Sequence, residues 1–171
     1  MAPGDVRGRQ GRTPPVPLLS ADSARPPRPA YTLTACVLLR RGERWLLTVR
    51  GRDVEDAPGT LGLVGGHVEA PAAATGVLED AARREAYEEV GVDLTGVTLT
   101  YQESEFFRTD AGVGQVCVSF LATLPTGVDP YAADPAELDE VLWRSADEAE
   151  IDPRCPWWLP ALLRRADLHQ D

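Results

Sequence analysis

The chain has 171 residues, which is enough for one domain with a sizeable hydrophobic core. Its net charge of −10 excludes broad binding to nucleic-acid polymers or anionic membranes, because the general field repels phosphate groups; a small anionic ligand could still bind beside a local cation. The sequence has no apolar run long enough to span a bilayer, and its first residues lack the apolar stretch of a secretory signal, so we expect a cytoplasmic protein.

The first predicted segment is a leader with little apolar content. Residues 1–30 hold seven of the 15 prolines and five arginines, with almost no apolar periodicity, and we interpret them as disordered or loosely packed. A basic partner-binding arm is the functional alternative. We expect residues 31–171 to form a single domain that ends in a C-terminal helix.

Two strands open that domain. The stretches "YTLTACVLLR" (31–40) and "RWLLTVR" (44–50) are apolar and rich in strand-forming residues, and "RGE" between them predicts a hairpin or two neighbouring strands. A polar loop at 51–62 and a short strand at 63–69 follow. The next stretch, "APAAATG" (70–76), is expected to be a loop.

A helix is then predicted from about Val77 to Val90, ended by Gly91. The remaining predicted elements are strands at 97–108, 115–124 and 137–145 and a C-terminal helix at 156–168. Pro160 must lie in the first turn of that last helix or kink it. Strands outnumber helices, so the sequence predicts a mixed α/β class, with a helix packed on a mostly antiparallel or mixed sheet.

The cysteine pattern predicts no disulfide framework. Cys36, Cys117 and Cys155 are odd in number and widely spaced, and none belongs to a CxxC motif. The first two lie in apolar, strand-like runs. We therefore interpret all three as reduced structural thiols.

The predicted helix carries two glutamates on its apolar face. At about 100° per residue, Glu85 and Glu89 fall within the stripe marked by Ala82 and Ala86, and Glu88 lies at its margin. Ionised, unpaired carboxylates that face the protein interior cost several kcal/mol each. Protonation, an arginine partner or a metal ion could remove that cost.

A hard divalent cation with oxygen ligands is the best of these three answers. Protonating both carboxylates requires a large shift from their usual pKa. Arg84 can reach Glu88 at i+4, but we do not expect it to serve Glu85 and Glu89 readily. Mg²⁺ suits a site that keeps waters and a phosphate in its coordination shell. The alternative is a helix whose buried face is rotated toward residues 77–82, so that the glutamates face solvent.

The stretch "GGHVE", a loop and "LEDAARREAYEEVGV" together resemble the Nudix box, G-x5-E-x7-R-E-U-x-E-E-x-G-U, in which U is aliphatic. The match is dense from Arg84 to Val92, and with the flanking strands the resemblance covers roughly residues 31–150. Two features depart from the pattern. Gly76 stands where the family has its first glutamate, and the spacing from Gly66 to Arg84 is four residues longer, which makes "APAAATG" look like a loop insertion.

The resemblance implies an α/β/α sandwich around a mixed β-sheet. It also implies hydrolysis of a nucleoside diphosphate linked to another moiety, or of a related pyrophosphate, with Mg²⁺ or sometimes Mn²⁺. Carried over residue by residue, Glu85, Glu89 and the backbone carbonyl of Gly66 would bind the metal. Glu88 would bind a second ion or hold a metal-bound water, and Arg84 would orient the glutamates.

Many members of the family recruit a further acidic residue beyond the box. Glu137 and Glu140 in "PAELDEVLW" are candidates, as are Glu103 and Glu105 in "YQESEFF", although each is also readily explained as a structural or exposed residue. His67 follows the glycines and could contact substrate or act as an acid or base; a loop histidine with satisfied hydrogen bonds is the alternative.

The substrate stays open at this stage. Signatures of coenzyme A, ADP-ribose and dinucleoside polyphosphate enzymes are not met, and a nucleoside triphosphate or a nucleotide-sugar remains. A non-catalytic nucleotide-binding module on the same fold is the rival from another class, and such modules usually lose glutamates that this chain keeps. A prenyl diphosphate isomerase would need a catalytic cysteine, for which Cys36 is the candidate. We expect a small-molecule nucleotide or diphosphate partner, no nucleic-acid polymer and no membrane; a homodimer is left open.

Overall fold

The computed structural model describes residues 30–69, 74–109, 111–124 and 126–169. The predicted leader therefore lies outside the described residues except for its last residue, and so does most of the predicted loop insertion. In chain order the described elements are β1 (Thr32–Arg41), β2 (Arg44–Arg50), β3 (Leu61–Gly62), β4 (Val64–His67), α1 (Val77–Val90), β5 (Thr100–Arg108), β6 (Gly114–Thr123), β7 (Leu138–Arg144), α2 (Ala146–Glu150) and α3 (Leu159–Asp167).

A mixed sheet forms the centre of the fold. Its strand order is β3-β2-β1-β6-β5, with β4 also paired to β1 and β7 also paired to β2. β1 and β6 run parallel, and the other strand pairs among the described residues are antiparallel. β1 and β2 pair only beside their turn, at Arg40–Trp45 and Arg41–Arg44. Beyond that point they diverge, so β1 takes β4 as its partner and β2 takes β7.

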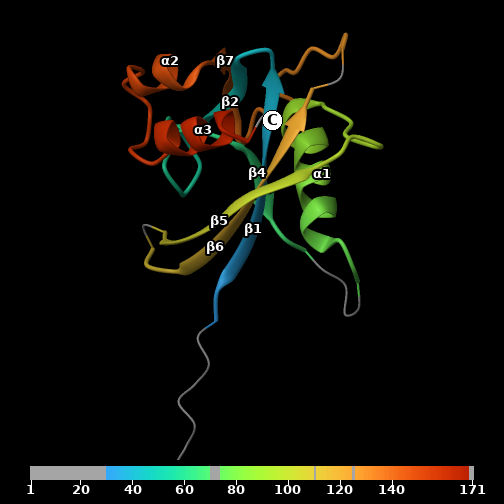
Figure 1. Ribbon diagram of the computed structural model, residues 1–171. Helices are drawn as coiled ribbons and strands as arrows, with labels where there is room; N and C mark the ends of the chain where they lie inside the picture. The colour runs from blue at the N-terminus through green and yellow to red at the C-terminus, as the bar shows by residue number, and fades with distance from the viewer. Residues whose placement is uncertain (1–29, 70–73, 110, 125, 170–171) are drawn as a thin grey trace, which may run out of the picture.

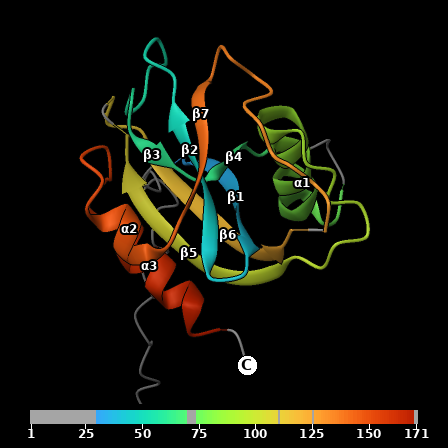
Figure 2. The same cartoon turned by 90° about the horizontal axis from the view of Figure 1, so that it is seen from above.

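Helices cover both faces of this sheet. Figure 1 shows α1 on one side of the strands and α2 and α3 on the other, and the view from above in Figure 2 shows the same three layers. This arrangement confirms the expected α/β/α sandwich around a mixed sheet. Among the described residues, none of the helices combines the length and the apolar character needed to cross a membrane.

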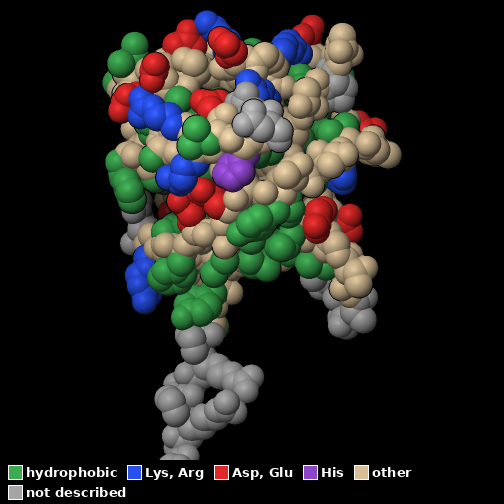
Figure 3. Space-filling model, viewed as in Figure 1, with side chains coloured by type: hydrophobic (Ala, Val, Ile, Leu, Met, Phe, Trp, Pro, Cys, Tyr) green, Lys and Arg blue, Asp and Glu red, His purple; other side chains and the backbone are tan. Residues whose placement is uncertain are grey.

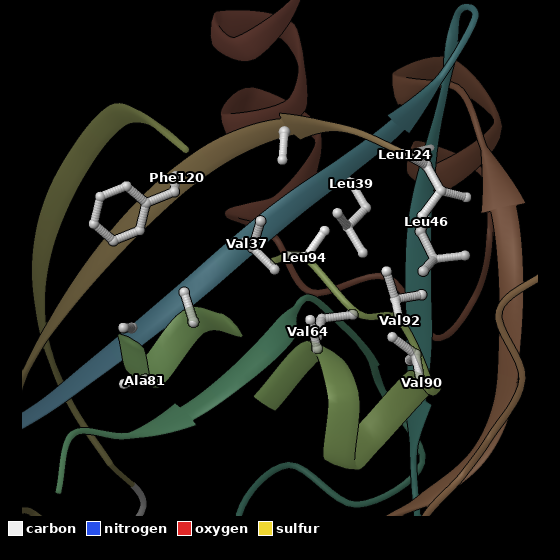
Figure 4. Packing of buried hydrophobic residues seen from close by; sticks show 14 of the residues in the cluster. Val37, Leu39, Leu46, Val64, Ala81, Val90, Val92, Leu94, Phe120 and Leu124 are labelled. Carbon is white, nitrogen blue, oxygen red and sulfur yellow. The ribbon is translucent and has the colours of Figure 1, made fainter. Parts of the chain in front are cut away.

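The alternation of β1 explains why there are two cores. Ala35, Val37 and Leu39 face α1, whereas Leu38 points to the opposite side, as expected for successive residues of a strand. The α1 side of the sheet is filled by the residues shown in Figure 4, among them Leu46, Val64, Val90, Val92, Leu94, Phe120 and Leu124. The other core joins β1, β2 and β7 to the last two helices and includes Trp45, Leu47, Leu142, Leu159, Leu162 and Leu163.

Most predicted elements are found, with two corrections. The predicted loop at 51–62 is wrong at its end, because Leu61 and Gly62 form β3 and pair with β2. The helix α2 was not predicted. It has five residues and starts with a capping box: the Ser145 side chain accepts a hydrogen bond from the Glu148 backbone N–H, and the Glu148 side chain accepts one from the Ser145 backbone N–H. The predicted helix at 77–90 is confirmed, and Pro160 lies in the first turn of α3.

β5 ends the strand order and leaves aromatic side chains, such as Phe106 and Phe107, exposed. Figure 3 shows hydrophobic side chains gathered over the lower part of this face, with acidic and basic side chains interspersed above them. Glu103 and Glu105 of this strand accept hydrogen bonds from Arg165, which belongs to α3. These ion pairs attach α3 to the edge of the sheet.

The buried alanines of α1 allow the helix to lie close to the sheet, and this close packing can be tested. Ala86 is fully buried there, so Ala86→Leu should overpack the interface and lower the free energy of unfolding by about 1–3 kcal/mol. Tyr87, the next residue, is 66% exposed, and Tyr87→Leu should change it by no more than about 0.5 kcal/mol. Urea unfolding of both variants measures the difference. An equal decrease in the free energy of unfolding in both variants would show that α1 does not pack closely on the sheet through its alanines.

Candidate functional site

Two carboxylates of α1 are buried against the sheet. Glu85 is 8% exposed and Glu89 is 4% exposed, although both are acidic residues one helical turn apart. This confirms the predicted direction of their side chains, and the alternative of a helix rotated to place them in solvent is wrong. Glu88 differs, because its side chain is 52% exposed.

Two glycines of β4 make room for these carboxylates. The N–H of Gly65 donates a hydrogen bond to Glu89 Oε2 at 3.0 Å. A side chain on Gly66 would overlap the carboxylate of Glu85. Gly65 has φ of 155°, and a methyl group on it would lie 2.6 Å from the Cα of Cys36 in β1. Only residues without a side chain allow strand and carboxylates to approach this closely.

Arg84 holds the exposed side of the cluster together. Its guanidinium donates to Glu85 Oε1 and Glu88 Oε2, both at 2.7 Å, and to the backbone carbonyl of His67 at 2.9 Å. The expectation that Arg84 would not serve Glu85 is therefore wrong. The planar guanidinium has several N–H groups, so it can bridge two carboxylates even where the helical wheel places them on different sides of the helix.

The end of α1 is held by a segment that precedes β7. Gly91 adopts a left-handed conformation with φ of 67° and ends the helix, as predicted. Beyond it, the N–H groups of Tyr131 and Ala133 donate to the carbonyls of Val90 and Glu89, at 3.3 and 2.8 Å. These bonds satisfy helix-end carbonyls and fix the path of the chain toward residue 137.

Burial controls the protonation of both inward carboxylates. It raises the pKa of Glu89 from 4.5 to about 8, against the opposing effect of the hydrogen bond from Gly65. The negative charges of Glu85 and Glu137 add to that rise. Burial also raises the pKa of Glu85, and the neighbouring charge of Arg84 opposes it. A cation between the carboxylates would favour their ionised forms.

The structure separates the further acidic candidates. The charge of Glu137 acts on both Glu85 and Glu89, and its backbone carbonyl accepts a hydrogen bond from Gly51 at 2.7 Å. Glu140 instead forms an ion pair with Arg154 at 2.7 Å. Of these two residues, Glu137 is therefore the one whose charge acts on the carboxylate pair.

The other candidates lie elsewhere. Glu103 and Glu105 lie at the contact with α3 described above, where Arg165 pairs with both. His67 has an exposed side chain, and its part in the cluster is the backbone carbonyl that Arg84 binds.

Two contributors to the site were not identified from the sequence. Gly65 supplies an N–H to Glu89, and the adjacent pair of glycines within a strand was a signal for such a close approach. Arg50, at the end of β2, lowers the pKa of Glu89 by its charge and donates to the backbone carbonyl of Asp56 at 2.7 Å. No pattern in this arginine-rich chain distinguished Arg50 from other arginines.

The donor set suits a hard cation with an incomplete protein shell. Glu85 and Glu89 offer two buried carboxylates, and the backbone of Gly66 lies against the first of them. Within the described ranges, no three His, Cys, Asp or Glu side chains are grouped so that they could hold a metal ion. Mg²⁺ commonly binds through one or two carboxylates and completes its shell with water and substrate phosphate oxygens, so these residues fit it.

A family model described as "NUDIX domain" matches residues 30–164, which include every element of the sheet and the carboxylate cluster. Among curated proteins, none matches this chain.

Solved structures share the fold. A MutT NUDIX hydrolase from Burkholderia pseudomallei is 22% identical with a TM-score of 0.63, covering 80% of this chain and 98% of its own. A C. elegans Ap4A hydrolase is 21% identical with a TM-score of 0.65, covering 80% and 96%. The NUDIX domain of Shewanella oneidensis NrtR, complexed with ADP ribose, is 19% identical with a TM-score of 0.66, covering 83% and 90%. At these identities the likeness concerns the fold.

The raised pKa of Glu89 yields a prediction for the chain without divalent cations. Between pH of about 5 and about 8 the folded chain keeps a proton on Glu89 that the unfolded chain has released, so the free energy of unfolding should fall as the pH rises. The fall should end above pH of about 8 and amounts to about 5 kcal/mol at most. Urea unfolding at stepped pH measures it.

Two glutamine variants control this pH experiment. Glu89→Gln should remove most of the fall, because the side chain no longer titrates. Glu88→Gln on the exposed side of α1 should retain it, since that side chain is half in solvent. The same pH dependence in both variants would show that Glu89 is not the titrating group.

Proposed function

The chain belongs to the NUDIX domain family, and we propose that it is a Mg²⁺-dependent hydrolase. In this proposal it cleaves a pyrophosphate bond in a nucleoside diphosphate derivative by attack of water on phosphorus. The observation that carries the proposal is the burial of Glu85 and Glu89 against the glycine pair of β4. A purely structural helix would place apolar side chains at these two positions.

Each residue of the cluster has a role in this proposal. Glu85, Glu89 and the backbone carbonyl of Gly66 would hold the cation, with Mn²⁺ as a substitute for Mg²⁺. Arg84 keeps Glu85 and Glu88 in place through its two carboxylate contacts. The cation, when bound, would neutralise charge on the diphosphate and lower the pKa of a coordinated water. Glu88, half exposed at the rim, would hold such a water or a second ion.

Glu137 is the residue that we assign as proton acceptor. Its side chain is exposed, yet its charge reaches both inward carboxylates. Its backbone carbonyl accepts a hydrogen bond from Gly51, which follows β2, so the backbone of Glu137 is tied to the end of that strand. A general base needs access to the attacking water, and the exposed side chain of Glu137 on a held backbone offers it.

The substrate class rests on chemistry shared with similar structures. The NrtR domain is complexed with ADP ribose, and another similar structure is an Ap4A hydrolase. Both compounds contain adenosine joined to a pyrophosphate linkage. A nucleotide or nucleotide-sugar with that linkage is therefore the class that we propose for this chain, with a non-catalytic nucleotide-binding module as the rival.

Phosphate or pyrophosphate release from a panel of nucleoside diphosphate derivatives tests hydrolysis directly. We expect release that depends on Mg²⁺ and falls about 100-fold or more in Glu85→Gln and Glu89→Gln, because each removes a carboxylate from the cation. Glu79→Gln, on the same helix, is the matched control and should keep the activity. A panel without release, combined with nucleotide binding by calorimetry, would instead support the binding module.

The choice between the two acidic residues near β7 is tested separately. Glu137→Gln should lower kcat by about 100-fold, the usual scale for loss of a general base. Glu140→Gln should keep kcat within a few-fold, because that side chain is paired with Arg154. Steady-state kinetics of both variants on one substrate measures this. A large loss in Glu140→Gln alone would reverse the assignment.

A further inference from the structure

We propose that Cys36 and Cys117 form a modification site: a pair of thiols that a low-molecular-weight disulfide oxidises to an intramolecular disulfide, displacing Gly65 beside it. Disulfide formation is argued from the pairing of β1 and β6, which carry the two thiols. The displacement of Gly65 is argued from the contact between β1 and β4. Neither requires a substrate, so both can be decided separately from the proposed function.

The two thiols face each other across the parallel strands β1 and β6. In the register of this pair Thr34 lies opposite Cys117 and Cys36 lies opposite Ser119, so the cysteines are diagonal neighbours on the same face. Their Sγ atoms are 3.3 Å apart, and all three cysteines of the chain are free. A disulfide bond is about 2.05 Å long, so the sulfur atoms must approach by a little over 1 Å.

Both thiols lie at partly buried positions on one face of the sheet. Cys36 and Cys117 are each partly exposed, and they lie on the sheet face opposite α1, because Ala35, Val37 and Val118 occupy the α1 side. Cys155, by contrast, packs against the core formed with α2 and α3. Its thiol donates a hydrogen bond to the backbone carbonyl of Pro156.

The environment determines which thiol reacts first. Hydrogen bonds from Cys36, Thr34 and Ser119 lower the pKa of Cys117 to about 7. The contact with Cys117 and burial raise the pKa of Cys36. Cys117 is therefore the thiolate that attacks, since the thiolate is the reactive form.

The exchange proceeds in two steps. The Cys117 thiolate attacks one sulfur of the small disulfide, forms a mixed disulfide and releases one small thiolate, which takes up a proton. Cys36 then loses its proton, attacks the Cys117 sulfur and expels the second small thiol. Two protein thiols are oxidised to one disulfide, and the small disulfide is reduced to two thiols.

Cys36 is also in direct contact with the strand that holds Glu89. It lies opposite Gly65 in the β1–β4 register, and its Cα would be 2.6 Å from a methyl group on that glycine. Gly65 in turn donates its N–H to Glu89. Movement of Cys36 toward Cys117 therefore changes the position of Gly65, which binds Glu89. Displacements near 1 Å are large for a catalytic site, so hydrolysis should fall on oxidation if the proposed function holds.

The test uses the reduced full-length chain treated with oxidised glutathione under native conditions. We expect an intact mass lower by two hydrogen atoms, a peptide that joins Cys36 to Cys117, and full reversal by dithiothreitol. Cys155→Ser should behave identically. Cys36→Ser should stop at a glutathione adduct on Cys117, because the resolving thiol is gone. If the native chain yields no peptide that joins Cys36 to Cys117, or yields one that contains Cys155, the proposed disulfide is wrong.

The effect on Gly65 is read from its backbone amide resonance. In a ¹⁵N-labelled chain, oxidation should shift the Gly65 amide, whereas Gly127, whose position has open space around it, should not move. Cys36→Ser treated in the same way should show no shift of Gly65. An oxidised chain with an unchanged Gly65 amide overturns the displacement, and hydrolysis that is equal before and after oxidation overturns its effect on activity.

Discussion

The close approach of two carboxylates to the backbone of a glycine pair is the constraint on which the rest of the site depends. Glu85 and Glu89 leave water to reach β4, and each loses the hydration that normally stabilises its charge. The protein compensates only in part, with one backbone N–H from Gly65 and one guanidinium from Arg84. A bound cation would remove the remaining deficit by favouring the ionised carboxylates.

The packing of α1 serves the same constraint. Its buried face consists of alanines around the two glutamates, and such small residues allow the helix axis to lie close to the strands. Larger side chains there would move the carboxylates away from β4. The divergence of β1 from β2 has a related effect, because it leaves β1 free to pair with β4 and so brings the glycine pair beneath the helix.

The features that follow from regular helix and strand geometry could be predicted from the sequence, whereas those that depend on loop paths and side-chain rotamers could not. A helix fixes the direction of every side chain, so Glu85 and Glu89 could be assigned to the buried face from spacing alone. β3 has two residues and α2 has five, too few for a periodic pattern to appear. Glu137 and Glu140 looked equivalent in the sequence, and only the folded chain shows that Glu140 pairs with Arg154 whereas the charge of Glu137 acts on the buried carboxylates. The reach of Arg84 to Glu85 depended on a rotamer that no pattern encodes.

The parallel pairing of β1 with β6 also determines when the fold can form. Thr32 and Gln115 are partners although most of the domain separates them in the sequence, and parallel pairing over such a distance carries a large loop-closure entropy. During synthesis β1 has no β6 beside it until residues 114–123 have been made. The elements β1, β4 and α1 lie earlier in the chain and contact one another, so the carboxylates can reach the glycine pair before this long-range pairing closes the sheet.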